Sequence, residues 1–425
     1  MLSRVQALNY RCLRYVDRSL LPFQVLIGPN ASGKSSFLDV VALLGDYVRE
    51  GLDNALLQTF QNPTGRATQV DQLIFNQSAP GFELAIELRV PEKLASRYQY
   101  ARYEVGFTKQ ENGELAIGGE TLWLHNDSQP SQNPILIQRA LFPVEQFPPE
   151  TLFTAPGKKR PLKGWRKVVN KIPESGNDYF RDEFGDWNMM FRVGTRKSSL
   201  GGLPQDENRF PISIWVRDLL LEGIHILALN SIAMRRPCSP SEARSFKVDG
   251  SNLPLVVQDL QKNNPDVFQD WVDHIQSVLP DVENILVQER FDDKHLYLAI
   301  KYQSGGEPVP SWLLSDGTLR MMALALLAYM PFHEGIYLIE EPENGIHPKA
   351  IEAVFQSLSS VYDSQILLAT HSPLLLTLAK REQILCFAKT DSGAVDIVSG
   401  EDHPALKDWH GQISLATLYA AGVLG

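Results

Sequence analysis

The chain of 425 residues contains few cysteines and no long apolar segment. Cys12, Cys238 and Cys386 lie far apart and form no C-x-x-C or metal-binding spacing, so we expect free thiols in a reducing, cytoplasmic compartment. No uninterrupted run of about 18 apolar residues is present, so we expect no membrane span. The first residues lack a charged segment followed by an apolar one, so we expect no signal peptide either.

Positive charge and repeated patterns are also scarce. The formal net charge is −10, so the chain has no overall basic surface for nucleic acid, and any DNA contact would need a local patch. Apolar heptads do not persist over the three or four repeats that a coiled coil needs, which excludes a long coiled-coil arm. The composition that remains is that of a globular protein with enough core for roughly two to three domains.

The strongest motif is a glycine-rich segment at 28–35, which we call the phosphate loop. It matches G-x-x-x-x-G-K-[ST] and lies between an apolar run at 25–27, typical of a buried strand, and an apolar run at 37–44, typical of a packed helix. In such a loop the backbone N–H groups surround a phosphate chain, and the start of the following helix attracts negative charge. We therefore predict that the chain binds ATP with Mg²⁺.

Each position of the phosphate loop has an expected task. Lys34 is expected to reach the β- and γ-phosphates, and the Ser35 hydroxyl is expected to ligate Mg²⁺. The predicted nucleotide-binding residues in and beside the loop are Gly28, Pro29, Asn30, Ala31, Ser32, Gly33, Lys34, Ser35 and Ser36.

A second group of candidate site residues follows two apolar runs in the last quarter of the chain. The run at 336–339 ends in Glu340 and Glu341, and a buried parallel strand would deliver both carboxylates beside the phosphate loop. We predict that Glu340 holds Mg²⁺ and that Glu341 orients and deprotonates the attacking water. The run at 366–369 is followed by His371, which either senses the γ-phosphate and positions the water or only caps a turn before Pro373.

A weaker motif, the segment 314–320, precedes an apolar helix predicted at 321–329. We call this segment the signature loop. Ser315 is suited to cap the helix, and Gly317 permits a close approach of another backbone.

The middle of the chain is less regular. Alternating residues at 82–90, and the runs at 103–107 and 121–124, predict a meander of antiparallel strands. Prolines interrupt residues 140–230, where a basic run contains Lys158, Lys159, Arg160, Lys163, Arg166, Lys167 and Lys171. This run is a solvated face, a salt-bridged partner of the acidic stretch at 174–186, or a contact for DNA or a partner protein. Residues 254–279 have the spacing of a helical hairpin, and strands are expected near 285–287 and 296–300.

The order of these motifs resembles that of one ATPase group. A phosphate loop, a long insertion, L-S-D-G-T, an apolar strand with E-E-P-E-N-G-I-H-P and finally A-T-H-S-P resemble the ABC-type ATPase heads of the SMC/RecF/OLD group, and within it the bacterial predicted ATPases catalogued as AAA-domain proteins. The resemblance covers about residues 1–45 and 230–425. The stretch after His371 is too short for the TOPRIM nuclease of OLD-family proteins, so we expect no fused nuclease.

The resemblance implies further roles. Ser315 and Gly317 would contact the nucleotide bound to a second copy of the chain, and residues 342–347 would form the D-loop at the interface of this homodimer. Arg11 is similar to a basic residue near the nucleotide in the group. Glu340 stands where many ABC-type heads have Asp, and the Q-loop glutamine is either Gln72 or Gln77.

We therefore predict an α/β fold, a P-loop NTPase with an ABC-type head in which helices flank a mixed sheet. Residues 1–135 are expected to form the N-terminal part of the head, 136–230 an insertion, and 231–425 a helical subdomain with the C-terminal part of the head. The expected activity is ATP hydrolysis coupled to dimerisation. The resemblance further implies a cytoplasmic sensor or regulator of an antiphage or toxin-like system that acts through a separate effector protein. The alternatives are a RecF-like ATPase that clamps DNA and, less favoured by the motifs, a transporter ATPase.

Overall fold

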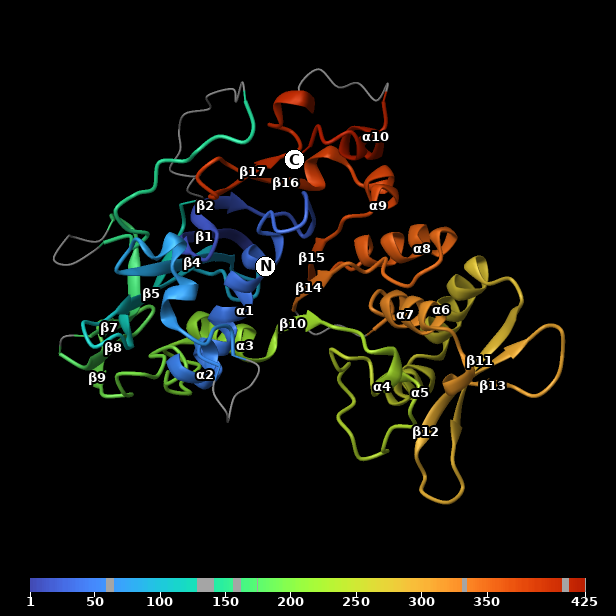
Figure 1. Cartoon of the computed structure of the whole chain (residues 1–425). Helices are drawn as coiled ribbons and strands as arrows, with labels where there is room; N and C mark the ends of the chain where they lie inside the picture. The colour runs from blue at the N-terminus through green and yellow to red at the C-terminus, as the bar shows by residue number, and fades with distance from the viewer. Residues whose placement is uncertain are drawn as a thin grey trace.

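The computed structural model describes residues 1–58, 65–127, 141–155, 162–173, 175–330, 335–406 and 413–424. Figure 1 shows a lobe of strands around the N-terminal helices and a mostly helical lobe, with a sheet between them. This arrangement is α/β, as the sequence predicts.

The central sheet has six strands in the order β10-β14-β15-β3-β16-β17. The first five run parallel, and β17 is antiparallel to β16. The strands are β3 (Phe23–Ile27), β10 (Ile224–Leu227), β14 (Ile336–Glu340), β15 (Gln365–Ala369), β16 (Ile384–Lys389) and β17 (Val395–Ser399). Every residue of β3 and β15 is buried, which is why these strands contain unbroken apolar runs at 25–27 and 366–369 and do not alternate.

The second sheet is antiparallel and has eight strands in the order β2-β1-β4-β5-β6-β7-β8-β9. Its strands are β1 (Leu2–Tyr10), β2 (Leu13–Ser19), β4 (Gly81–Arg89), β5 (Tyr100–Lys109), β6 (Leu115–His125), β7 (Arg166–Ile172), β8 (Asn177–Arg181) and β9 (Asn188–Phe191). The predicted meander is therefore present as β4, β5 and β6. Residues 166–191, from the predicted insertion, continue the same sheet, while the domain boundaries at 135 and 230 stay predictions.

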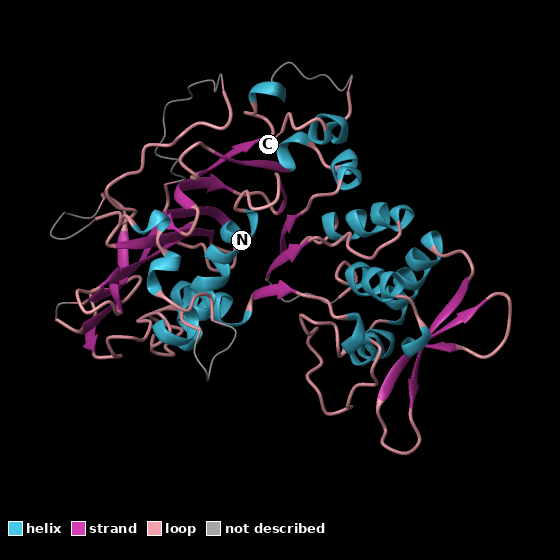
Figure 2. Cartoon of the chain, viewed as in Figure 1, coloured by secondary structure: helices cyan, strands magenta, loops and turns pink. Residues whose placement is uncertain are grey.

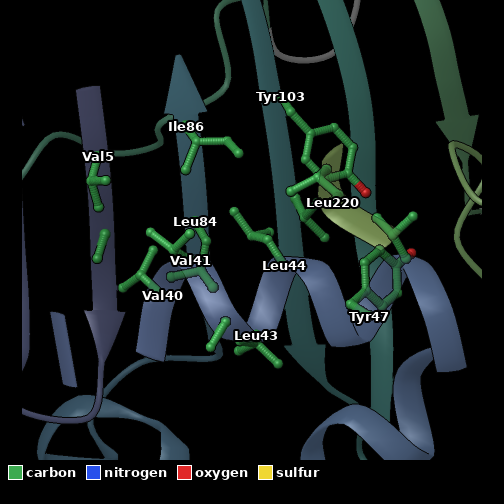
Figure 3. Close-up of a cluster of buried hydrophobic side chains, with 14 of the residues drawn as sticks. Val5, Val40, Val41, Leu43, Leu44, Tyr47, Leu84, Ile86, Tyr103 and Leu220 are labelled. Atoms are coloured by element: carbon green, nitrogen blue, oxygen red, sulfur yellow. The ribbon is translucent and has the colours of Figure 1, made fainter. Parts of the chain in front are cut away.

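Helix α1 (Lys34–Glu50) lies between the two sheets. Figure 3 shows its side chains, among them Val41 and Leu44, directed at Leu84 and Ile86 of β4. Leu26 of β3 belongs to the same buried cluster, so α1 holds the phosphate loop against both sheets. Two further helices complete this lobe, α2 (Leu52–Leu56) and α3 (Pro211–Glu222).

The second lobe is mostly helical (Figure 2). Its elements are α4 (Ser231–Met234), α5 (Leu253–Asn263), α6 (Pro265–Val278), α7 (Asp316–Leu326), α8 (Pro348–Ser359), and a small sheet of β11 (Val282–Glu289), β12 (Leu296–Tyr302) and β13 (Val309–Pro310). The predicted hairpin is α5 and α6, broken at Asn264-Pro265. Helices α9 (Pro373–Leu378) and α10 (Leu415–Ala420) lie against one another near the end of the chain.

Short 3-10 helices link these elements at η1 (Val70–Leu73), η2 (Phe75–Gln77), η3 (Ser311–Leu313), η4 (Arg381–Gln383) and η5 (Pro404–Leu406). Within the described ranges, no helix combines the length and the apolar character needed to cross a membrane.

Candidate nucleotide-binding site

A pocket of about 650 Å³ lies at the carboxyl ends of the central strands, beside the phosphate loop. The predicted residues that line it are Arg11, Asn30, Ala31, Ser32, Gly33, Lys34, Ser35, Ser36, Glu340, Glu341 and His371. Gly28 and Pro29 contact the pocket indirectly, because their carbonyls accept hydrogen bonds from Lys34. The fold thus brings together residues that are more than 300 positions apart in the sequence.

Lys34 is buried, and its charge faces neutral acceptors. Its Nζ donates to Gly28 O at 2.8 Å, to Pro29 O at 3.0 Å and to Ser32 Oγ at 3.4 Å. Burial lowers the pKa of Lys34 to about 8, against the opposing effect of Glu341 and Glu340. A buried ammonium that has only dipoles as close partners is suited to receive an anion such as a phosphate.

The start of α1 is built for close approach of a ligand. Gly33, which precedes the helix, has a φ of 98°, and it carries no side chain that would cap the first N–H groups. A Cβ at Gly33 would lie 2.6 Å from Val395 Cγ2, so both the conformation and the space require glycine. The uncapped N–H groups therefore face the pocket, where they can bind phosphate oxygens.

The residues predicted to hold Mg²⁺ are in direct contact. The Ser35 hydroxyl donates to Glu340 Oε2 at 2.8 Å, so a hydroxyl and a carboxylate oxygen face the same point of the pocket. In the described part of the chain no group of three or more His, Cys, Asp or Glu side chains is placed to hold a metal. This pair fits Mg²⁺, which takes oxygen ligands and completes its shell with phosphate oxygens and water.

Glu341 lies where the chain turns at the end of β14. Its φ is 48°, in the left-handed region, and its N–H donates to Ala369 O of β15 at 2.8 Å. This turn lets Glu340 and Glu341 both line the pocket, although neighbours on a straight strand point to opposite sides. A non-glycine residue held in this region stores strain of about 1–3 kcal/mol, a feature often found at functional sites.

His371 faces Glu341 across the pocket. Its Nε2 lies 3.8 Å from Glu341 Oε1, while its Nδ1 lies 3.4 Å from the hydroxyl of Tyr419. Burial, and then the nearby Lys34 charge, lower the pKa of His371 below its ordinary value, so the imidazole is neutral at pH 7. The backbone N–H of His371 donates to Glu343 Oε1 at 3.2 Å, which fixes the chain at this point.

Arg11 lines the pocket from the turn between β1 and β2, with a φ of 51°. Its Nη1 lies 3.0 Å from Asp39 Oδ2, and Asp39 also accepts a hydrogen bond from Tyr10 OH at 2.6 Å. Arg66 donates through Nε to the other oxygen of Asp39 at 2.6 Å. Asp39 of α1 thus connects the rim of the pocket to the helix that follows the phosphate loop.

Both candidates for the Q-loop glutamine, Gln72 and Gln77, line the pocket. The Gln72 side chain accepts hydrogen bonds from the N–H and the hydroxyl of Thr68. Gln77 has a φ of 54°, next to Asn76 with a φ of 46°. The choice between the two glutamines therefore stays open.

The signature loop lies apart from the pocket of its own chain, since neither Ser315 nor Gly317 is among the lining residues. Ser315 is exposed and caps α7, because its Oγ accepts a hydrogen bond from Thr318 N at 3.1 Å. The predicted cap at Ser315 is therefore confirmed, but α7 (Asp316–Leu326) begins and ends earlier than the predicted helix at 321–329.

The segment 342–347, the predicted D-loop, packs directly against the signature loop. A Cβ at Gly317 would lie 2.4 Å from Gly345 O, so only glycine permits this contact. Arg320 Nη1 donates to Asn344 O at 3.1 Å, and the Asn344 side chain in turn donates to Glu341. A chain of hydrogen bonds thus joins the signature helix to the predicted catalytic carboxylate.

The basic run predicted as a DNA or partner contact is largely engaged within the chain. Lys171 forms an ion pair with the buried Asp178 at 2.6 Å, and Arg166 donates to Asp182 O. Lys167 lies over the Trp123 ring, 4.5 Å from its centre. Lys163 is exposed, and Lys158, Lys159 and Arg160 lie outside the described residues. The described members therefore favour the interpretation as a face paired with the acidic stretch.

Sequence patterns did not indicate several residues of the site. Cys12, Asp71, Ile74, Asn76, Ala369 and Lys389 also line the pocket. Tyr419, near the end of the chain, donates to Gly28 O at 3.0 Å. Apart from Ala369, the first residue of the A-T-H-S-P motif, these residues belong to no motif of fixed spacing, so only the fold places them here.

Comparison with protein families places part of the chain in a known family model. A family model described as "AAA domain, putative AbiEii toxin, Type IV TA system" matches residues 250–377. This stretch includes the signature loop, Glu340, Glu341 and His371, whereas the phosphate loop lies outside it.

Two curated relatives come from Vibrio cholerae serotype O1. The DNA replication and repair protein RecF is 28% identical over 222 residues, which are 51% of each protein. The Retron Vc95 probable ATPase of biovar El Tor is 36% identical over 90 residues, which are 21% of this chain and 18% of that protein. The chain thus spans about half the length of the RecF protein that it matches.

A solved structure extends the comparison to the whole fold. The crystal structure of an Smc head bound to the C-winged helix domain of ScpA superposes with a TM-score of 0.51, over 99% of both chains, at 13% sequence identity. At this identity the likeness establishes the fold, that of an ABC-type P-loop ATPase head.

Proposed function

We propose that this chain, which carries an ABC-type ATPase head of the SMC/RecF group, binds ATP with Mg²⁺ and hydrolyses it between two copies of itself. The observation that carries this proposal is the separation of the site into two parts. The pocket has the phosphate loop and the carboxylates of Glu340 and Glu341, whereas the exposed Ser315 and the partly exposed Gly317 lie outside it at the start of α7. A second chain would supply these two residues, as the sequence resemblance implies.

In the proposed reaction each residue has one task. The N–H groups at the start of α1 and Lys34 bind the phosphates and compensate the charge that develops on them. Ser35 and Glu340 would hold Mg²⁺, which supplies charge neutralisation for the β- and γ-phosphates. Glu341 accepts a proton as the water oxygen bonds to the γ-phosphorus and the bond from that phosphorus to the bridging oxygen breaks, which gives ADP and phosphate.

The arrangement also supports a switch that responds to nucleotide. ATP shared by two chains binds the dimer more tightly than the monomer, so ATP shifts the equilibrium towards the dimer and hydrolysis releases it. The hydrogen bonds from Glu341 through Asn344 to Arg320 give a physical route from the nucleotide to the dimer surface.

We propose that the switch controls a separate effector protein in a defence or toxin-like system. The retron ATPase relative and the printed description of the matched family support this role. A second candidate, an ATPase that clamps DNA, is supported by the name of the RecF relative. The net charge of −10 and the engaged state of Arg166, Lys167 and Lys171 favour the first candidate.

The first experiment uses Glu341→Gln, which keeps the shape of the side chain but removes the base. We expect ATP turnover to fall by about 100-fold or more, while ATP with Mg²⁺ holds the protein as a dimer in light scattering. The wild-type protein without nucleotide is the control. A Glu341→Gln protein that stays monomeric with saturating ATP would contradict the proposal.

A mixing experiment tests whether the signature loop acts on the partner's nucleotide. Lys34→Ala and Ser315→Arg should each be inactive alone. A mixed dimer contains one site with an intact phosphate loop and an intact signature loop, so an equal mixture should recover about a quarter of the wild-type rate if the sites act independently. No recovery would mean that Ser315 does not complete the partner's site.

The two candidate roles are separated by binding assays. A DNA clamp predicts ATP-dependent binding to labelled DNA that weakens steeply with salt. The effector role predicts little DNA binding and a stable complex with another protein when the tagged chain is purified from its native cells with and without ATP.

A further inference from the structure

We infer that Tyr419 is a positioning residue that holds His371 in one tautomer, with the Nδ1 proton directed at Tyr419 and a bare Nε2 directed at the attacking water. This inference rests on the proposed ATP hydrolysis and adds to it a residue that lies outside every motif of the site.

Tyr419 bridges two parts of the site. It lies on α10, which packs against α9, and its half-buried hydroxyl is 3.0 Å from Gly28 O of the phosphate loop and 3.4 Å from His371 Nδ1. The same carbonyl of Gly28 also accepts a hydrogen bond from Lys34. Helix α10 thus connects His371, the second residue after β15, to the start of the phosphate loop.

The position of the protons follows from what each atom can do. A backbone carbonyl only accepts, so the hydroxyl proton of Tyr419 lies towards Gly28 O. The Tyr419 oxygen is then left as an acceptor, and the contact with His371 Nδ1 is a hydrogen bond only if Nδ1 carries the proton. Burial raises the pKa of Tyr419, so its hydroxyl keeps its proton at pH 7.

The charged groups around His371 are consistent with this arrangement. Glu341, Glu343 and Glu340 favour a protonated imidazole, whereas burial and Lys34 oppose it and lower the pKa of His371 overall. The imidazole is therefore neutral, and with the proton on Nδ1 its Nε2 is an acceptor.

The bare Nε2 and Glu341 Oε1 form a pair of acceptors 3.8 Å apart at the pocket. One water molecule can bridge two acceptors by donating both of its protons. Its lone pairs then point away from them, as attack on a γ-phosphate requires. The other tautomer, with a proton on Nε2, would offer the water a donor and turn it in a different direction.

The kinetic test compares Tyr419→Phe with Tyr362→Phe. Tyr362 is 80% exposed, so its variant controls for loss of a tyrosine hydroxyl. We expect Tyr419→Phe to lower kcat for ATP by about 10-fold, the loss typical of a residue that orients a reacting group, with KM nearly unchanged. On a His371→Ala background the same change should have no further effect, because the two residues act as a unit.

The tautomer is measured directly on nucleotide-free protein by NMR with ¹⁵N-labelled histidine. The His371→Asn variant assigns the His371 signals among the nine histidines. We expect the Nδ1–H form in the wild type and in Tyr362→Phe, and a shift towards the Nε2–H form, which histidine prefers in water, in Tyr419→Phe.

Different results of the two measurements would refute the proposed hydrolysis and the role of Tyr419. An inactive wild-type protein whose His371 signal is in the Nδ1–H form would refute the proposed hydrolysis and leave the tautomer assignment standing. A wild-type His371 in the Nε2–H form, an unchanged kcat in Tyr419→Phe, or an equal loss on the His371→Ala background would overturn the role of Tyr419.

Discussion

Lys34 in the pocket and Glu120 in the eight-stranded sheet are both buried charged side chains, but their surroundings differ. Glu120 is fully buried and accepts hydrogen bonds from Tyr47 OH, Tyr103 OH, Ser198 Oγ, Ser199 N and Leu200 N. Lys34 has two carbonyls and one weak hydroxyl contact, and burial lowers its pKa to about 8.

This difference in partners distinguishes a structural charged residue, Glu120, from a candidate ligand-binding one, Lys34. Glu120 has its donors from three segments of the same chain, so nothing outside the protein is needed to stabilise its charge. Lys34 has no hydrogen bond or ion pair to a carboxylate in the described part of the chain, and its charge costs free energy until an anion enters the pocket. We therefore interpret a buried charge with complete partners as structural, and one with incomplete partners as a ligand site.

The largest effect is expected from Glu120→Ala. Five donors would lose their shared acceptor in a buried site, so we expect the free energy of unfolding to fall by about 3–5 kcal/mol, measured by urea denaturation. The exposed Glu111→Ala is the control and should change it by less than about 0.5 kcal/mol. If the protein does not fold, Glu120→Gln keeps one acceptor and provides the measurement. If Glu120→Ala lost ATP affinity but kept its stability, the interpretation of Glu120 as a structural residue would be wrong.

Lys34→Ala should show the opposite behaviour. We expect ATP affinity to fall by about 100-fold in calorimetry, since a charge-assisted contact to phosphate is lost, while the unfolding free energy hardly changes. The exposed Lys262→Ala should bind ATP as the wild type does. Micromolar ATP affinity retained by Lys34→Ala would refute the assignment of the phosphate loop.

The smallest expected effect is the uptake of a proton by Lys34 when ATP binds. Because the pKa of Lys34 is about 8, the Lys34 side chain of the nucleotide-free protein is mostly deprotonated at pH 8.5. The phosphates of ATP raise this pKa on binding, so Lys34 takes up a proton. Binding should take up about 0.8 proton at pH 8.5 and about 0.2 at pH 7.5. Calorimetry in two buffers of different ionisation enthalpy measures this uptake. Equal values at both pH values would show that Lys34 is charged in the empty pocket at pH 8.5.

Local patterns predicted the centre of the site well. The phosphate loop, the strand before Glu340 and the helix start at Ser315 each depend on neighbouring residues, so the sequence indicates them and the structure has them. Two contributions could not be predicted in this way. Strands β7–β9 join the eight-stranded sheet by pairing with β6, and Tyr419 reaches Gly28 from the other end of the chain.

One face of the eight-stranded sheet is another feature that the sequence could not predict. Alternation along β4 suggests that Ala85 and Glu87 face water, yet both are buried. Residues 144–155 cover this face, where Leu152 packs with Ala85 and its N–H donates to Glu83. An irregular segment without helical or strand periodicity leaves no pattern from which its packing partner can be inferred.

The bonds that Lys34 makes to Gly28 and Pro29 have a consequence for the cycle as a whole. Without nucleotide, Lys34 donates hydrogen bonds within the phosphate loop. In the proposed ATP complex it would donate to the phosphates in their place. In the proposed hydrolysis cycle the loop would therefore keep its shape after product release, and the next ATP would only have to exchange hydrogen-bond partners with Lys34. Such a head would bind ATP again without rearrangement. The association and dissociation of two chains would then limit the rate of the proposed switch.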